Sequence, residues 1–373
     1  MKILPIATLL LLLQLPACGA QDAKSPDGNR TESMVGGCAE KDSRCAYEAG
    51  RKHVVKKISF WKPALGLPPN KRIGTAPPEL IEFLKLDVMA QSIAAKPKSP
   101  TLTPDFIAEV TAAFDELPEE VRRLLGSRLL GIYFIEDIGG SGFTDMAFDE
   151  NGNATAGFIV LDPAVLMQRA ANEWATWRDN TPFKPGSEFR LVAEIEAGNQ
   201  NNRKNAIQYI LLHELAHVIS IGGSLHPSWN IQPGEVTSLS SYPFFQLSWR
   251  RSDDGKKFIS RFDAQFPQRT DVVYYFGARL ATSQMADIYE KLEQTNFVTL
   301  YGATRPGDDF AEAFANYVHT VMMGRPFAIR IYREGKVAKV FEACWKQPRC
   351  AEKKKILEDL LGAAPGKPTA AIR

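Results

Sequence analysis

Residues 211–218 read Leu211-Leu212-His213-Glu214-Leu215-Ala216-His217-Val218, and this stretch contains the pattern HExxH. The residues around it, from about 203 to 219, are apolar on most sides, which predicts a buried helix. Asn201 or Asn202 can cap the start of this helix. Residues four positions apart lie on the same face of a helix, so His213 and His217 can bind one metal ion.

The position of Glu214 indicates a catalytic metal site rather than a structural one. Glu214 follows the first histidine and lies beside the histidine face, so it can reach a zinc-bound water without binding the metal itself. Zinc lowers the pKa of such a water to about 7, and a carboxylate can then accept its proton. The sequence therefore predicts one Zn²⁺ per chain, bound by His213 and His217, with Glu214 as general base.

A catalytic zinc also needs a third protein ligand. The longer pattern HExxHxxGxxH is not present, because Ser220 and Gly223 stand where that pattern has its glycine and last histidine. His226 follows soon after, and its spacing leaves it open as a ligand. Residues 308–316 (DDFAEAFAN) predict a second helix, in which alanines flank Glu312 and let two helices approach closely.

HExxH followed at a distance by DDFAEAFA resembles the gluzincin metallopeptidases, especially the group that includes anthrax lethal factor and the proline-proline endopeptidases. The resemblance rests on these two short motifs. It implies a zincin-like fold, peptide-bond hydrolysis and Glu312 as the third zinc ligand. It also implies an oxyanion-stabilising tyrosine upstream of that ligand. Tyr301 is the nearest, with Tyr274 and Tyr275 as alternatives.

A zinc-bound histidine usually donates its other ring nitrogen to a carboxylate or a carbonyl. Asp309, one turn before Glu312, and Asn316, one turn after it, are the candidates for this supporting position. A lone histidine is more often structural than functional, and we interpret His319 in that way.

The remaining pattern predicts an α+β fold with a small twisted sheet over the HExxH helix and a mostly helical C-terminal half. Expected helices cover residues 75–88, 103–114, 119–130, 163–178, 203–219, 285–294, 308–322 and 351–361. Expected strands cover residues 131–138, 144–148, 156–161, 189–196, 327–332 and 337–341, with a hairpin turn at Asn151-Gly152. A peptide substrate would add to an edge strand, and residues 189–196 suit that role by position.

The N-terminus predicts export. Lys2 precedes a short apolar run over residues 3–15, which is typical of a secretory signal. Residues 15–18 (LPAC) resemble the lipobox of bacterial lipoproteins, although Pro16 departs from it, and this resemblance implies a lipid on Cys18. Cleavage after Ala20 is the alternative. The expected organisation is a signal peptide (1–17), a lipidated Cys18 with a tether (18–50), a helical part (51–130) and a zincin-like catalytic domain (131–373).

The cysteine count supports this interpretation. The chain has five cysteines, and Cys18 as lipid carrier leaves two close pairs, which predict disulfides Cys38–Cys45 and Cys344–Cys350 outside the cytosol. A zinc site built from these four is less well matched, because neither pair has the usual spacing. Gly19 after the lipidated cysteine indicates the outer membrane if the cell is Gram-negative.

These observations together predict a zinc metallopeptidase of the cell envelope or extracellular space. Its expected partners are a protein or peptide substrate and a membrane, through the lipid anchor. A net charge of +2 without a dense basic block argues against nucleic acid. Two alternatives stay open: a non-catalytic zinc-binding envelope lipoprotein, and a hydrolase that acts on a different bond on the same scaffold.

Overall fold

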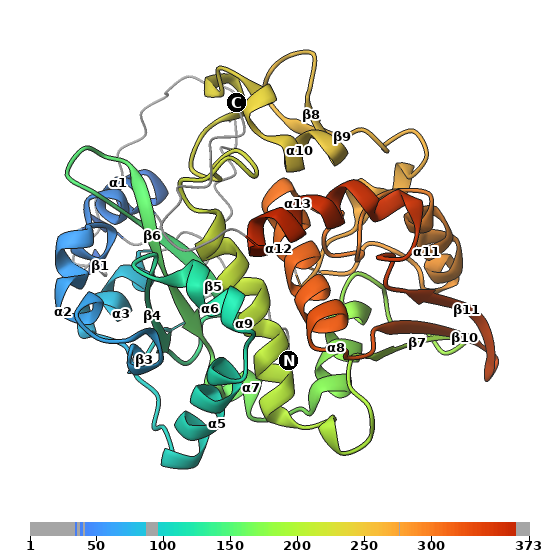
Figure 1. Cartoon of the computed structure of the whole chain (residues 1–373), viewed down its shortest axis with the longest axis horizontal. Coiled ribbons are helices and arrows are strands. Elements are labelled where there is room, and N and C mark those ends of the chain that lie inside the picture. Colours follow the sequence, from blue (N-terminus) through green and yellow to red (C-terminus); the bar gives the residue numbers. More distant parts are fainter. Residues whose placement is uncertain (1–33, 36–37, 40–41, 87–95, 276, 363–373) are drawn as a thin grey trace, which may run out of the picture.

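A computed structural model describes residues 34–35, 38–39, 42–86, 96–275 and 277–362 of this chain. The long helix α9 (Arg203–Ser220) runs through the middle of the molecule (Figure 1). A four-stranded sheet with several helices lies on one side of α9, and a mainly helical part with a three-stranded sheet lies on the other. The fold is therefore mixed α+β with small sheets, as the sequence predicted.

The four-stranded sheet has the order β3-β4-β6-β5. Strands β3 (Ile73–Thr75), β4 (Leu129–Phe134) and β6 (Ala154–Leu161) are parallel, whereas β5 (Gly142–Phe148) is antiparallel to β6. The predicted Asn-Gly hairpin joins β5 to β6, and Gly152 has a φ of 80°, which a residue without Cβ adopts easily. Strand β5 is thus an edge strand.

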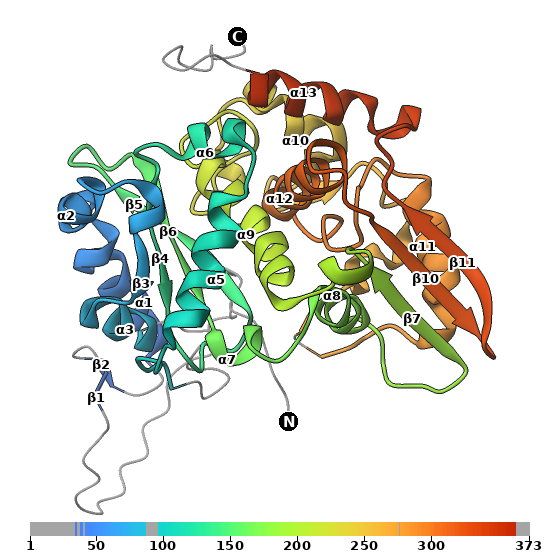
Figure 2. The ribbon, with the colours of Figure 1, turned by 60° about the horizontal axis from the view of Figure 1, so that its bottom comes forward.

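Both faces of this sheet are covered. Along β4 and β6 successive side chains enter two different cores, because the side-chain period of a strand is two. One face packs on the N-terminal helices, and the other packs on α9 and α5 (Figure 2). The helices of this part are α1 (Ser43–Lys52), α2 (Lys62–Leu65), α3 (Pro78–Lys85), α5 (Pro104–Asp115), α6 (Glu119–Leu125) and α7 (Pro163–Leu166).

Helix α9 is buried on nearly every side. Its first turn is capped by Asn202, whose side chain accepts a hydrogen bond from the backbone N–H of Asn205 at 3.0 Å. Of its residues, only Arg203, Lys204 and His217 are not buried. The apolar pattern predicted this, and it places the HExxH residues between the sheet and the second part of the molecule.

The second part surrounds the other side of α9. Its three-stranded antiparallel sheet has the order β11-β10-β7. Helix α12 lies directly against α9. The elements are α8 (Ala171–Asn180), β7 (Phe189–Glu194), α10 (Pro243–Ser248), β8 (Trp249–Arg251), β9 (Phe258–Ser260), α11 (Met285–Glu293), α12 (Pro306–Tyr317), the π-helical turn η9 (Val318–Met322), β10 (Ala328–Arg333), β11 (Lys336–Glu342) and α13 (Ala351–Gly362).

Several predicted boundaries were wrong. Thr75 ends β3 instead of capping a helix, and α3 begins after Pro77. The helix expected over 119–130 ends at Leu125, because Gly126 has a φ of 35° and reverses the chain. The helix expected over 163–178 is two helices, α7 and α8.

Both predicted disulfides are confirmed. Cys38 is bonded to Cys45 and Cys344 to Cys350, with Cα–Cα distances of 5.7 and 5.9 Å. The first bond links the short ribbon β1 (Met34–Val35) and β2 (Cys38–Ala39) to α1. Disulfides are typical of proteins outside the cytosol.

Within the described ranges no helix has the length and apolarity needed to cross a bilayer. The signal peptide and Cys18 lie outside the described residues.

Candidate metal centre

The two motif histidines present the same ring nitrogen to one point. His213 and His217 occupy consecutive turns of α9, and their Nε2 atoms are 3.2 Å apart. His213 is 7 % exposed, and His217 is the one residue of the motif that is only half-buried. The point between the two nitrogens therefore lies at the edge of a buried helix and is open on one side.

Asp308 completes a group of three potential ligands. It lies in the first turn of α12, and its Oδ1 is 3.6 Å from His217 Nε2. One ligand atom from each of His213, His217 and Asp308 lies within 4.8 Å of the others. Burial opposes ionisation of Asp308, but the hydrogen bond with His217 and the charge of Arg305 lower its pKa to about 2. With this pKa the Asp308 carboxylate is ionised at neutral pH.

Glu312, the predicted third ligand, lies behind His213 instead of beside the two Nε2 atoms, and it is not in the group of three. Its Oε1 is 2.9 Å from His213 Nδ1, the ring nitrogen that faces away from His217. Its Oε2 accepts a hydrogen bond from Thr299 Oγ1 at 2.8 Å. The side chain is fully buried and both oxygens have partners. A proton on His213 Nδ1 is therefore held by Glu312, which leaves the Nε2 lone pair free for a metal.

A buried arginine fixes Glu312. Arg178 Nη1 lies 3.1 Å from Glu312 Oε1, and Nη2 lies 3.4 Å from Asp179 Oδ2. Tyr274 donates its hydroxyl to Asp179 Oδ1 at 3.0 Å. Burial alone would raise the pKa of Glu312, but the charge of Arg178 and the bond to His213 lower it. The charge of Arg178 therefore leaves His213 with an ionised hydrogen-bond partner, whereas burial raises the pKa of Asp179.

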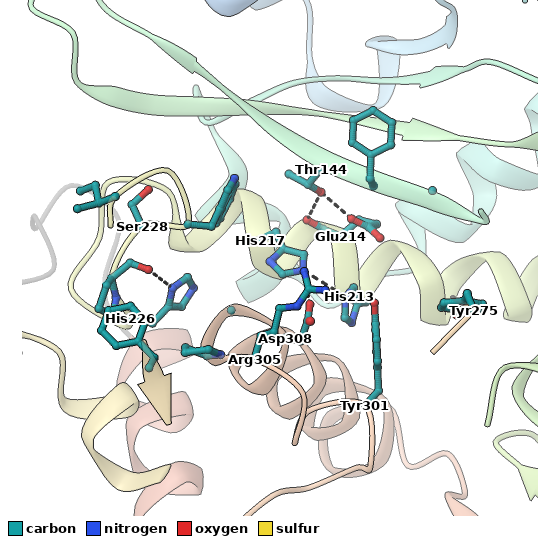
Figure 3. A pocket seen from close by; sticks show the side chains of 18 of the residues that line it. Thr144, His213, Glu214, His217, His226, Ser228, Tyr275, Tyr301, Arg305 and Asp308 are labelled. Carbon is teal, nitrogen blue, oxygen red and sulfur yellow. Dashed lines mark hydrogen bonds and ion pairs between the residues drawn. The ribbon is translucent and has the colours of Figure 1, made fainter. Parts of the chain in front are cut away.

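Glu214 faces the same cavity from the sheet side. Thr144 on β5 donates its hydroxyl to Glu214 Oε2 at 2.8 Å and also lies 3.0 Å from the Glu214 backbone carbonyl. Figure 3 shows Glu214 and Thr144 on one side of the two histidines and Asp308 on the other. Glu214 thus lies beside the two histidines without belonging to the group of three potential ligands.

The tyrosines considered from sequence have different surroundings. The ring of Tyr301 stacks on His213, with centroids 5.5 Å apart, and Tyr301 lines the cavity. Tyr275 also lines the cavity and has a φ of 67°, which is rare for a residue with a side chain. Tyr274 does not line the cavity, and its hydroxyl is hydrogen-bonded to Asp179. Burial raises the pKa of Tyr301, so its hydroxyl stays protonated and can donate.

Other predicted residues lie near the centre without joining it. His226 lines the cavity, but its Nδ1 faces the carbonyl of Pro227 at 2.9 Å, and it is not in the group of three. Asp309 is bonded to Lys353 and Trp249. Asn316 accepts a hydrogen bond from Trp345. Asp309 and Asn316 were expected to support a zinc-bound histidine, and the structure gives that position to Glu312.

His319 is structural, as expected. Its Nε2 is 2.7 Å from the carbonyl oxygen of Ile195, and its ring packs edge-on against Tyr209. Burial lowers its pKa to about 4, so the imidazole is neutral at physiological pH.

The centre opens into a cavity of about 500 Å³. Its floor is the motif part of α9 and the start of α12, and its walls come from the beginning of β5 and from residues 226–233 and 256–258. Among the described residues that line it, the only carboxylates are Glu214 and Asp308. A molecule the size of a short peptide segment can enter beside the histidines.

Sequence analysis missed Thr144, Arg178 and the ligand position of Asp308. Asp308 could have been predicted as a candidate, because it lies one helical turn before Glu312 and therefore on the same face of the helix. Thr144 and Arg178 carry no such signal, since they come from elements distant in sequence that only the tertiary fold brings to α9.

The donor set can hold a metal ion. Two nitrogens bound to one tetrahedral metal at about 2.0–2.1 Å lie roughly 3.3 Å apart, and the two Nε2 atoms are 3.2 Å apart in this structure. The carboxylate of Asp308 supplies a third donor, whose negative charge is opposite to that of a metal cation.

Comparisons of this chain with protein-family models, with curated proteins and with solved structures each gave no match.

Proposed function

We propose that this chain is a zinc-dependent peptidase with a zincin-like catalytic part. The observation that carries the proposal is the convergence of His213, His217 and Asp308 at a cavity that Glu214 also faces. Two imidazoles and a carboxylate are a donor set typical of catalytic zinc, and they leave a fourth position open. The gluzincin resemblance supports the same function, with Asp308 replacing Glu312 as the ligand from the second helix.

The zinc would act as a Lewis acid on the substrate carbonyl and lower the pKa of water. Glu214 accepts the proton of the attacking water and returns it to the departing amine. Thr144 holds the Glu214 carboxylate on the sheet side of the cavity. Tyr301 is placed beside His213 and can donate its hydroxyl to the oxyanion.

Strand β5 supports binding of an extended peptide. It is an edge strand, and Gly142, Phe143 and Thr144 at its start line the cavity. An edge strand can pair with a substrate backbone through main-chain hydrogen bonds. We therefore move this role from residues 189–196 to β5, because β7 belongs to the other sheet and none of its residues lines the cavity.

The site favours an enzyme over a purely metal-binding lipoprotein. A structural zinc site is normally closed by four protein ligands, whereas this group has three and faces an open cavity. Glu214 is 7 % exposed and is not part of the group, so a structural site would bury a carboxylate without using it.

We also propose that the protein acts in the bacterial cell envelope, held by a lipid on Cys18, with release after Ala20 as the alternative. The two disulfides support a compartment outside the cytosol. The substrates would then be periplasmic or extracellular proteins.

Hydrolysis of a peptide library, with and without a chelator, tests the enzymatic part. We expect cleavage that a chelator abolishes and that added zinc restores. Glu214→Gln should retain zinc and lower kcat by about 10²–10⁴-fold, because the amide cannot accept a proton. Cleavage by Glu214→Gln near the parent rate would exclude Glu214 as the base, and zinc binding without any cleavage by the parent would favour the binding-protein alternative.

A further inference from the structure

Three cationic side chains that line the cavity form no ion pair with a described residue. Arg305 precedes α12 and is half-buried, and Lys256 and Lys257 lie in the hairpin between β8 and β9. Among the described residues, no carboxylate lies within ion-pair distance of these three side chains. Figure 3 shows Arg305 next to Asp308, across the histidines from Glu214.

The acidic groups nearby have hydrogen-bond or ion-pair partners of their own. Asp308 faces His217, and Glu214 is bonded to Thr144. In the hairpin, Asp253 pairs with Arg250, and Asp254 accepts hydrogen bonds from the Ser252 hydroxyl and the Lys256 backbone N–H. Of the cations that line the cavity, Arg178 alone is neutralised, by Glu312 and Asp179. Asp308 and Asp254 offset part of the charge of Arg305, Lys256 and Lys257, and these three cations outnumber the two carboxylates.

These three cations are also placed where a substrate would bind. Arg305 is three residues before Asp308, so its position is tied to the proposed metal. Phe258 and Trp229 line the cavity as well and give it apolar surface beside these charges. Arginine binds a carboxylate in a fixed, two-pronged geometry, and flexible lysines add charge at the rim.

We propose that Arg305, Lys256 and Lys257 form a subsite for a carboxylate of the substrate, so that this chain prefers acidic peptides. The proposal rests on the proposed peptidase function and names its substrate class. The carboxylate has two sources: an acidic side chain near the scissile bond, or the C-terminal carboxylate of the substrate. The first gives an endopeptidase with an acidic preference, and the second a carboxypeptidase.

Binding to the full chain tests the subsite separately from turnover. Zinc-loaded Glu214→Gln is titrated with three fluorescent hexapeptide pools of otherwise neutral composition: one with an internal Glu and an amidated C-terminus, one with Gln in its place, and one with Gln and a free C-terminal carboxylate. Fluorescence anisotropy gives Kd. We expect one of the two carboxylate pools to bind about tenfold more tightly than the neutral pool, because several exposed pairs each contribute a few-fold. Added salt should reduce the difference.

The double variant Lys256→Gln/Lys257→Gln, made in the same background, should lose most of this preference. The control is Lys354→Gln/Lys355→Gln on α13, which removes the same charge from residues that do not line the cavity and should keep the preference. Arg305→Lys should retain more of the preference than Arg305→Gln.

Equal binding of all three pools, or a preference unchanged in Lys256→Gln/Lys257→Gln, would overturn the subsite. Those results leave the peptidase proposal intact if the parent still cleaves neutral peptides. A carboxylate preference in binding without any hydrolysis by the parent would support the subsite and contradict the peptidase proposal.

Discussion

Asp308 and Glu312 lie one turn apart on the same face of α12, yet their surroundings differ. Asp308 is at the start of the helix, beside the Nε2 atoms of both histidines. Glu312 is one turn deeper, where Arg178 and Thr299 occupy its oxygens. In the proposed site the first carboxylate would contact the metal, and the second would orient His213.

This difference predicts unequal effects on metal affinity. Asp308→Asn should lower zinc affinity by more than about 10²-fold, because it removes a charged ligand. Glu312→Gln should lower it by about 10–100-fold, the range found when a group that supports a ligand is changed. Competition with a chromophoric chelator measures both. A larger loss in Glu312→Gln than in Asp308→Asn would restore Glu312 as the ligand.

At this scale the sequence predicted part of the centre. HExxH places His213, His217 and Glu214 beside one another because spacing within a single helix determines their geometry. The choice between Asp308 and Glu312 depends on how far α12 slides along α9, and no local pattern records that displacement. The contact of Arg178 with Glu312 could not be predicted either, because Arg178 lies on α8 and only the tertiary fold brings it to α12.

Among the elements, α12 is held in place by a buried ion pair with α13. Asp309 is bonded to Lys353, and both side chains are essentially inaccessible to solvent. The Lys353 ammonium also lies over the rings of Phe244 and Phe297, 5.1 and 5.0 Å from their centroids. Burial lowers the pKa of Lys353 and raises that of Asp309, and the pair opposes both shifts.

Lys353→Met should therefore be strongly destabilising, by about 3–5 kcal/mol, because it leaves Asp309 buried without a counter-ion. Adding Asp309→Asn should recover much of the loss, since the amide can still accept from Trp249. The half-exposed neighbour provides a control: Lys354→Met should change the free energy of unfolding by less than about 1 kcal/mol. Urea unfolding compares the variants. An unfolding midpoint of Lys353→Met equal to that of the parent would contradict this.

Elements with strong local signals were predicted well. The Asn-Gly turn between two candidate strands predicted β5 and β6, and the cap and apolar pattern predicted α9. The three-residue strands β3, β8 and β9 are too short to show a period. β8 and β9 carry the lysines of the proposed subsite between them, so this part of the cleft emerged only from the structure.

At the scale of the whole molecule, the proposed lipid on Cys18 would decide where the protein works. The tether predicted over residues 18–50 overlaps α1, which begins at Ser43 and is linked to Cys38 by a disulfide. Cys18→Ser should move the protein from the membrane to the soluble fraction, because it removes the acyl chains that hold it. Cell fractionation with immunodetection shows this. A parent protein that is already soluble, or a variant that stays in the membrane, would argue for release after Ala20.

The metal centre lies where the two parts of the molecule meet, since α9 supplies the histidines and the base and α12 supplies the carboxylate. Anomalous diffraction at the zinc edge, from crystals of the zinc-loaded protein, tests this arrangement most directly. We predict one zinc per chain, about 2.0–2.2 Å from His213 Nε2, His217 Nε2 and an oxygen of Asp308, with Glu312 still bonded to His213 Nδ1. A zinc bound by Glu312 or His226 in place of Asp308, or no zinc at these histidines, would contradict the account.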